Sequence, residues 1–242
     1  MEDQLYQSFY DVEMRHWWFV ARREILLDII ETRLHLPAGS KVLDVGCGVG
    51  GMLVSLSDRY EAYGTDTSTL AIEFCRKRGL KNVFECDLKG LPLPNLEFDL
   101  IMLLDVIEHV DDDLGLLREA FGRLKKGGIV LVTVPAYQFL WTRHDDLNHH
   151  KRRYVGRRLG RVLVESGFLV DRMSYFNTLL FPLALVTRLL HKVLGSGNES
   201  ELSIPPSPLN NILKSIFSLE RPLLRRLSFW FGLSILAIAR KH

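Results

Sequence analysis

The sequence predicts a doubly wound α/β fold, and three observations support this prediction. Five short apolar segments alternate with stretches of helical character between residues 41 and 135. These segments are continuously apolar, which is typical of parallel strands covered on both faces. A glycine-rich turn follows the first segment, at the strand end where such sheets bind their ligand. A length of 242 residues with 47% apolar residues fits one domain with an elaborated end.

The individual elements follow from the spacing of apolar residues and from the turn signals. Residues 1–36 have helical periodicity and end before Pro37. Strands are expected at residues 41–45, 62–66, 82–87, 98–104 and 128–134, and helices at residues 52–60, 70–78 and 114–124, with the last helix ending at Lys126-Gly127-Gly128. A polar loop, a helix at residues 157–166, a strand at 168–175, amphipathic helices within 178–230 and a strand at 232–240 follow.

Composition and charge narrow the function. A net charge of +2, from 31 basic and 29 acidic residues, argues against a dedicated nucleic-acid binder. Cys47, Cys75 and Cys86 have neither a disulfide nor a metal-ligand spacing, and we expect no metal. The polar, acidic start of the chain is unlike a secretory signal, and no uncharged stretch reaches the roughly 20 residues of a spanning helix. We therefore expect a cytoplasmic protein.

The glycine turn indicates the kind of ligand. Gly46, Gly48 and Gly51 fit G-x-G-x-x-G between a strand and a helix, where free backbone N–H groups can meet a cofactor. This spacing equally fits a dinucleotide. Asp44 lies two residues before the turn, and a carboxylate there is repelled by a pyrophosphate but attracted by a positive centre.

Two further strand ends are acidic. Asp66 ends the second predicted strand, where it can accept hydrogen bonds from both ribose hydroxyls. Asp87 ends the third strand, and with Leu88 it is placed to meet an adenine. A ligand with a ribose, an adenine and a positive centre fits this set. The alternative is that Asp44 caps a turn and Asp87 is merely solvated.

Five segments stand in an order and spacing that belong to a known family. They are VLDVGCGVGG (42–51), GTDTS (64–68), ECDLKGLPLP (85–94), FDLIMLLDVIEHVDD (98–112) and LKKGGIVLVTVP (124–135). Together they resemble the class I S-adenosylmethionine (SAM)-dependent methyltransferases. The resemblance implies SAM as cofactor and a mostly parallel seven-stranded Rossmann-like sheet, with residues 168–175 and 232–240 as an antiparallel edge hairpin.

The resemblance also implies a domain organisation. Residues 1–36 would be N-terminal covering helices, residues 37–176 and 231–242 the SAM-binding core, and residues 177–230 a helical insertion. The segment HWWFVARREIL (16–26) resembles the covering helix of bacterial relatives, so Arg22 is a candidate for binding the SAM carboxylate. Trp17 either contacts the substrate or packs in the core.

The remaining cofactor residues follow from the matching positions. The methionine part of SAM would be surrounded by Asp44, Gly46, Cys47 and Gly48. At the end of the second strand, Asp66 and Thr67 would hold the ribose. At the end of the third, Asp87 and Leu88 would hold the adenine. At the end of the fourth, Leu103 and Leu104 would line the path to the methyl group.

The loop WTRHDDLNHHKRRY (141–154) follows the fifth strand and is expected above the active-site end of the sheet. Side chains able to position or deprotonate an acceptor are His144, Asp145, His149, His150 and Tyr154. The alternative is a solvated loop in which His and Asp side chains bond each other. For His109, after the fourth strand, we favour a packing role at a helix start.

A basic run continues from this loop. Arg152 and Arg153 are its candidates for substrate binding, because guanidinium groups favour phosphates and carboxylates. An anionic acceptor such as a phosphorylated sugar or an acid would suit them, and a solvated helix face is the alternative. The same loop resembles a subgroup of bacterial methyltransferases associated with glycans and specialised metabolites.

Three interpretations compete for residues 177–230. These helices would cover the substrate pocket, form a homodimer interface, or lie on an anionic membrane surface. We rank the first two above membrane association, because a soluble subdomain needs no further assumption.

The sequence therefore predicts a SAM-dependent methyltransferase that acts on a small molecule or glycan precursor, at oxygen, without a nucleic-acid partner. A nicotinamide-dependent oxidoreductase and a non-catalytic SAM-binding partner subunit are the alternatives. Tight NAD binding without SAM binding would favour the first alternative, and SAM binding without turnover would favour the second.

Overall fold

A single seven-stranded sheet organises the chain in the computed structural model, which describes residues 3–194 and 203–242. The strands are β1 (Lys41–Val45), β2 (Glu61–Asp66), β3 (Val83–Glu85), β4 (Phe98–Leu104), β5 (Leu124–Pro135), β6 (Leu169–Phe176) and β7 (Ser234–Arg240). The helices of the described residues are α1 (Asp3–Val12), α2 (Trp17–Ile29), α3 (Gly51–Leu56), α4 (Thr69–Lys77), α5 (Asp113–Arg123), α6 (Arg143–Leu147), α7 (Gly156–Glu165), α8 (Phe181–Leu194), α9 (Ser207–Ser218) and α10 (Glu220–Leu224). A π-helical turn, η1 (Ile30–Leu34), and a 3-10 turn, η2 (Gln138–Leu140), complete them.

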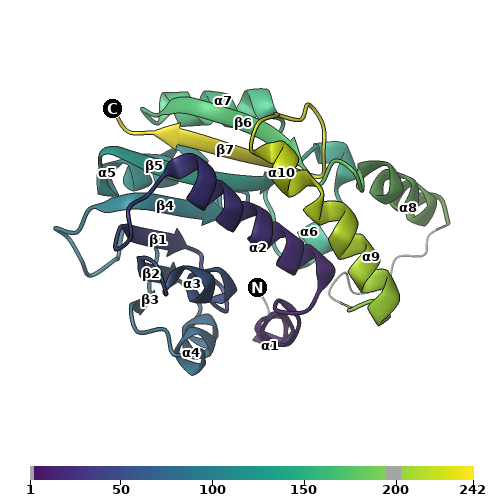
Figure 1. The fold of residues 1–242 in the computed structure, drawn as a ribbon, viewed down its shortest axis with the longest axis horizontal. Helices are drawn as coiled ribbons and strands as arrows, with labels where there is room; N and C mark the ends of the chain where they lie inside the picture. The colour runs from purple at the N-terminus through teal and green to yellow at the C-terminus, as the bar shows by residue number, and fades with distance from the viewer. Residues whose placement is uncertain (1–2, 195–202) are drawn as a thin grey trace.

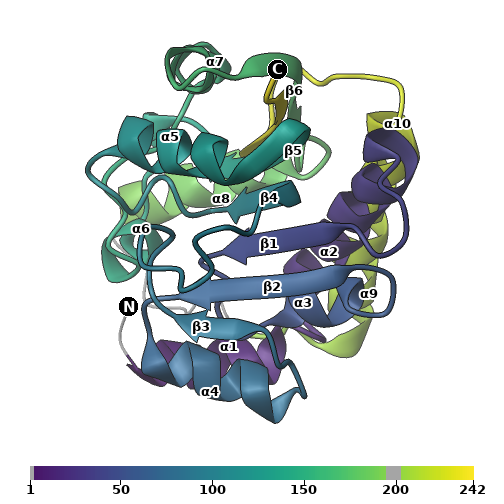
Figure 2. The same cartoon turned by 90° about the vertical axis from the view of Figure 1, so that its left-hand side faces the viewer.

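The strand order confirms the predicted fold class. The order is β3-β2-β1-β4-β5-β7-β6, in which β1 to β5 run parallel and β7 runs antiparallel to both of its neighbours. Figure 2 shows the strands in this order, with α4 beside β3 and α7 beside β6. The order reverses between β1 and β4, so the ends of these two strands leave a crevice for a ligand.

Both faces of the sheet are buried, which explains the continuously apolar strands. On β4, Ile101 and Leu103 belong to the core cluster that includes residues of α5 and α7. Leu100 and Met102 face the opposite cluster, which includes residues of α2, α9 and α10. Each fully buried aliphatic side chain of this kind contributes about 1.5–3 kcal/mol.

Side-chain caps begin two of the helices that follow strands. Ser68 caps α4, and its hydroxyl accepts a hydrogen bond from the Ala71 N–H at 3.3 Å. Asp112 caps α5 in the same way through the Gly115 N–H at 2.8 Å. These caps fix the direction in which α4 and α5 leave the ligand-binding end of the sheet.

The start of β5 and the glycine cap of α5 were predicted wrongly. The helix ends at Arg123, and residues 124–126 already belong to β5. Leu124 is fully buried and pairs with Phe98, so its burial in the sheet outweighs helix continuation. Gly127, with a φ of 77°, lies in the irregular part of the β4–β5 pairing instead of capping the helix.

The C-terminal helices are tied to the N-terminal ones and to the end of β6. Figure 1 shows α9 beside α2. Asn210 of α9 accepts the backbone N–H of Trp17 at 2.9 Å. Glu220 is fully buried and accepts the backbone N–H groups of residues 177, 178 and 179. Among the described helices, none combines the length and apolar character needed to cross a membrane.

Candidate active site

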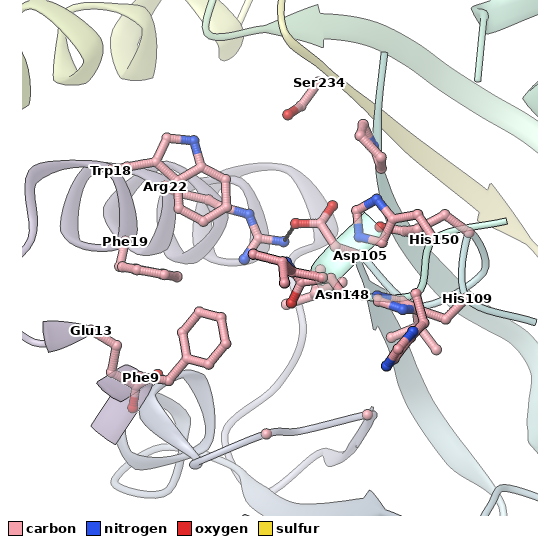
Figure 3. Close-up of a pocket in the computed structure, with 18 of the residues that line it drawn as sticks. Phe9, Glu13, Trp18, Phe19, Arg22, Asp105, His109, Asn148, His150 and Ser234 are labelled. Atoms are coloured by element: carbon pink, nitrogen blue, oxygen red, sulfur yellow. Dashed lines mark hydrogen bonds and ion pairs between the residues drawn. The ribbon is translucent and has the colours of Figure 1, made fainter. Parts of the chain in front are cut away.

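A cavity of about 1890 Å³ lies at the carboxyl ends of the parallel strands. Figure 3 shows side chains of α1 and α2 on one side of it and the histidines that follow β4 and β5 on the other. Residues expected from the sequence to form a site line it as follows: Trp17, Arg22, Asp44, Gly46, Cys47, Gly48, Asp66, Thr67, Asp87, Leu88, Leu104, His149, His150 and Arg153.

The glycine turn is held against β2 by its own backbone. The N–H groups of Gly46 and Cys47 both donate to the carbonyl of Thr65, at 2.8 and 2.9 Å. Gly46 has a φ of 69°, and a Cβ atom there would lie 2.8 Å from a methyl group of Val106. Gly46 therefore answers both a conformational and a steric requirement.

Asp44 is a buried carboxyl group on the cavity wall. Burial raises its pKa to about 7, although the nearby Arg22 acts in the opposite direction. A cationic ligand beside this group would stabilise its ionised form. The sulfonium and ammonium groups of SAM have the required charge.

Asp66 holds the turn in place at the end of β2. Its two carboxylate oxygens accept the N–H groups of Gly48 and Ser68, each at 2.9 Å. Burial raises its pKa, and these two hydrogen bonds oppose the rise. Tyr6 of α1 also bonds to Asp66, so α1 covers this part of the cavity.

Arg22 and Asp105 form an ion pair in the middle of the cavity wall. Arg22 Nη2 lies 2.8 Å from Asp105 Oδ2 (Figure 3). The same nitrogen donates to the Thr133 hydroxyl at 2.8 Å. The ring of Trp18 stacks on the guanidinium at 5.1 Å. Arg22 therefore lines the cavity, and Asp105 already neutralises part of its charge, while the contact of Arg22 with the SAM carboxylate stays a prediction.

His150 is held by a buried carboxylate. Its Nδ1 lies 2.8 Å from Asp145 Oδ1, while Arg153 donates to both oxygens of Asp145 at 2.8 Å. Burial alone would raise the pKa of Asp145, but the hydrogen bonds from His150 and Arg153 outweigh it and hold that pKa well below its usual range. Because ionised Asp145 only accepts, Nδ1 is the protonated nitrogen of a neutral His150 ring, and Nε2 then has the lone pair.

Glu108 and His109 lie against His150. The rings of the two histidines are 4.6 Å apart between centroids (Figure 3). The backbone N–H of Lys151 donates to the carbonyl of Glu108 at 2.7 Å, which brings these segments together. Burial, reinforced by His150, lowers the pKa of His109 to about 4. The favoured packing role of His109 is therefore incomplete, because its ring also lines the cavity.

Four residues predicted for the site lie outside the cavity lining, among them Asp145, which acts behind His150. Leu103 is fully buried within the sheet, so Leu104 alone of this predicted pair lines the cavity. Tyr154 is also fully buried, and its hydroxyl donates to Asp113 at 2.7 Å, while burial raises its pKa further. Arg152 pairs with the same Asp113 at 2.9 Å. A deprotonating role for Tyr154 and a substrate contact for Arg152 are therefore both disfavoured.

Two further residues of this loop were predicted to act on the acceptor, Arg153 by binding it and His144 by positioning or deprotonating it. Arg153 reaches the cavity, but its guanidinium is bound to Asp145 and serves to position that carboxylate. The side chain of His144 lies outside the part of the structure that is described.

Two features of the lining carried little signal in the sequence. Asn177, almost fully buried with a φ of 56°, lines the cavity, and neither end of its side-chain amide is bonded within the described chain. Residues 184, 185, 187 and 188 of α8 also line the cavity. A polar residue directly after the sixth strand was a usable signal for Asn177, whereas nothing local marked α8.

Comparison with known proteins agrees with this geometry. The model of a methyltransferase domain family matches residues 14–172. A probable SAM-dependent methyltransferase of Mycolicibacterium smegmatis is 30% identical over 168 residues, which cover 67% of this chain and 63% of that protein. Phosphoethanolamine N-methyltransferase 1 of Arabidopsis thaliana is 34% identical over 171 residues, which cover 61% of this chain and 33% of that protein.

Solved structures agree on the fold. A SAM-dependent methyltransferase from Archaeoglobus fulgidus superposes with a TM-score of 0.58 and 21% identity, over 90% of this chain and 94% of that one. The chain spans only about a third of the plant relative, so the activity of that whole protein does not transfer directly. The family match, the sheet order and the glycine turn together establish that the chain belongs to the class I SAM-dependent methyltransferases.

Proposed function

We propose that this methyltransferase transfers the SAM methyl group to a hydroxyl of a small anionic acceptor, such as a phosphorylated sugar or another glycan precursor. The observation that carries the proposal is the Asp145–His150 pair, which presents a histidine lone pair on the cavity wall opposite α1 and α2. An amine acceptor needs the same removal of a proton, so this pair alone does not distinguish an oxygen from a nitrogen acceptor.

The reaction needs proximity and one proton acceptor. SAM supplies an activated methyl carbon, and the acceptor oxygen must approach it in line with the breaking C–S bond. Bound SAM would supply the methyl group and leave as S-adenosylhomocysteine, and His150 Nε2 would take the hydroxyl proton of an acceptor held beside it. Ionised Asp145 stabilises the resulting imidazolium, which is the usual role of a carboxylate behind a catalytic histidine.

The distribution of charge along the cavity supports an anionic acceptor. The acidic groups Asp44, Asp66 and Asp87 gather at the ends of β1, β2 and β3 or just beyond. The other part of the cavity is lined by Asp105 and Glu108 and by more numerous basic side chains, from the segment after β5 and from α8: Arg143, Lys151, Arg153 and Arg188. Arg153 is held by Asp145, Lys151 pairs with Asp111 at 3.4 Å and Arg188 donates to the Leu140 carbonyl at 2.9 Å, so an anionic acceptor would meet positive groups that are already oriented by the chain.

Transfer to nitrogen is the second candidate. It is favoured by relatives named as phosphoethanolamine N-methyltransferases, whose acceptor carries a phosphate and an amine. A phosphorylated acceptor is common to both candidates. They differ only in the atom that meets the methyl group.

The helices of residues 177–230 fit best as a cover for the acceptor part of the cavity. Four residues of α8 line the cavity, and Glu220 anchors the segment that leads into α8. This favours the covering interpretation over a dimer interface or a membrane-bound surface, and it makes Asn177 a candidate acceptor contact.

A single pair of variants tests the proposal. His150→Asn retains a nitrogen donor for Asp145 but removes Nε2, so turnover should fall by about 10²- to 10⁴-fold. Transfer of labelled methyl from SAM would be followed with phosphorylated sugars and with phosphoethanolamine. Binding of S-adenosylhomocysteine, measured by calorimetry, should stay within about twofold, because His150 lies beyond the cofactor residues.

The matched control is His35→Asn, which changes an exposed histidine outside the cavity lining. The φ of His35 is 50°, a left-handed conformation that Asn tolerates. Its turnover should equal that of the wild type. The proposal would be contradicted if the wild type bound the cofactor but methylated neither the phosphorylated sugars nor phosphoethanolamine. Full activity of His150→Asn would contradict it as well.

A further inference from the structure

We infer that Glu108, His109 and His150 form a binding site for a divalent transition-metal cation on the wall of the cavity. The inference builds on the proposed function and refines one part of it. Each residue offers one ligand atom, and these atoms all lie within 4.8 Å of one another. Around a shared cation with bonds of about 2.1 Å, ligand atoms stand roughly 3.4 Å apart, so small side-chain rotations complete the site.

Glu108 is the strongest single indication. Its side chain is fully buried, and neither carboxylate oxygen is bonded by another residue in the described ranges. A buried carboxylate without partners is costly for a fold, and a bound cation would remove that cost. Glu108 also borders the cavity, so a cation can reach it.

Both histidines have the supporting contacts that metal ligands need. His150 donates Nδ1–H to Asp145, which leaves Nε2 free to coordinate. A ring N–H of His109 is bonded to the backbone carbonyl of Asn148. In each case the other ring nitrogen is the one available to a cation, and the hydrogen bond limits the ring to small rotations.

The donor set indicates the class of metal. Two imidazole nitrogens and one carboxylate oxygen suit Mn²⁺, Fe²⁺, Co²⁺ or Zn²⁺, whereas Mg²⁺ and Ca²⁺ prefer oxygen ligands. Three protein ligands leave coordination positions open on the cavity side. An acceptor hydroxyl bound there would have a lowered pKa and would release its proton to water, so His150 would act through the cation instead of as the base.

The sequence alone gave no sign of this site. Glu108 and His109 follow β4, while His150 comes from a loop about 40 residues later. The hydrogen bond from the Lys151 N–H to the Glu108 carbonyl joins these segments only in the folded chain.

The test measures metal binding directly. Full-length protein freed of metal with a chelator would be titrated with Co²⁺, following its visible absorbance and the heat of binding. We expect one site per chain. Glu108→Gln should weaken it at least tenfold, and Asp145→Asn about 10- to 100-fold through loss of the contact behind His150. His149→Asn is the matched control, because His149 is adjacent to His150 but outside the cluster, and its affinity should equal that of the wild type.

A second readout guards against misfolding. Co²⁺ should raise the melting temperature of the wild type and of His149→Asn but not that of Glu108→Gln, whose circular dichroism should match the wild type. Wild-type protein that binds no Co²⁺, Mn²⁺ or Zn²⁺, or equal affinity in Glu108→Gln, would overturn the inference. Calorimetry with S-adenosylhomocysteine in chelator separates the two proposals: cofactor binding without metal binding rejects only the metal site, whereas loss of cofactor binding rejects the proposed function.

Discussion

The two ends of the cavity are built in different ways. The cofactor end comes from a short stretch of chain, in which the glycine turn after β1 is bonded to Thr65 and Asp66 of β2. The acceptor end combines the segment after β4, the loop after β5, Asn177 and α8. Contacts within a compact motif can be recognised from spacing, whereas contacts between distant segments depend on the finished fold.

The two ends also treat their carboxylates differently. At the cofactor end, burial raises the pKa of Asp44 and of Asp66, which leaves these groups ready for a cationic ligand. At the acceptor end, Asp145 is bonded by His150 and Arg153, which hold its pKa low. Asp44 would thus gain from a positively charged ligand, as would Glu108 at the acceptor end, whereas Asp145 already has its cationic partner.

The largest expected effect is on the acceptor end. Arg153→Met removes the partner of a fully buried carboxylate and should destabilise the fold by about 3–5 kcal/mol. Urea denaturation would measure this. The control is Arg157→Met, at the exposed second residue of α7. Its free energy of unfolding should stay within about 0.5 kcal/mol of the wild type. Equal stabilities for the two variants would show that Asp145 does not depend on Arg153.

The next effect is on the cofactor end. Asp66→Ala removes the acceptor for the Gly48 and Ser68 N–H groups together with the expected ribose contact. We expect at least about a 100-fold loss of S-adenosylhomocysteine affinity by calorimetry, which corresponds to roughly 2.7 kcal/mol. Asp58→Ala, at an exposed acid in the turn after α3, is the control. An unchanged affinity for Asp66→Ala would mean that the turn binds the cofactor without this carboxylate.

The smallest effect is a pH dependence that originates at Asp44. Its pKa is about 7 in the folded chain and about 3.9 when unfolded, so the native state binds more protons between these values. Its contribution to stability is therefore fully present below about pH 4 and is lost as the pH rises to 7. Asn does not titrate, so Asp44→Asn does not lose stability in this way. Its melting temperature should exceed that of the ligand-free wild type by at least about 3 °C at pH 8.

The difference in melting temperature between Asp44→Asn and the wild type should shrink toward zero near pH 4. Differential scanning fluorimetry across pH would measure it. SAM should reduce the difference at pH 8, because its positive charges stabilise ionised Asp44 in the wild type only. A difference that is constant across pH would rule out the titration of Asp44 as its cause.

The sequence by itself determined the sheet, the family and the cofactor. Apolar strands, helix caps such as Ser68 and the glycine turn are encoded by neighbouring residues, so their periodicity and spacing could be recognised directly. The fold class, the methyltransferase family and SAM were predicted in this way and are confirmed.

Only the tertiary structure decided which side chains of the acceptor end face the cavity. Tyr154 and His150 come from the same polar loop, yet Tyr154 is buried against Asp113 while His150 reaches the cavity beside Glu108. No local pattern distinguishes them, because the choice depends on hydrogen bonds between distant segments, such as the one from the Lys151 N–H to the Glu108 carbonyl. Those bonds form only when β4, β5 and the segment after β5 are packed together.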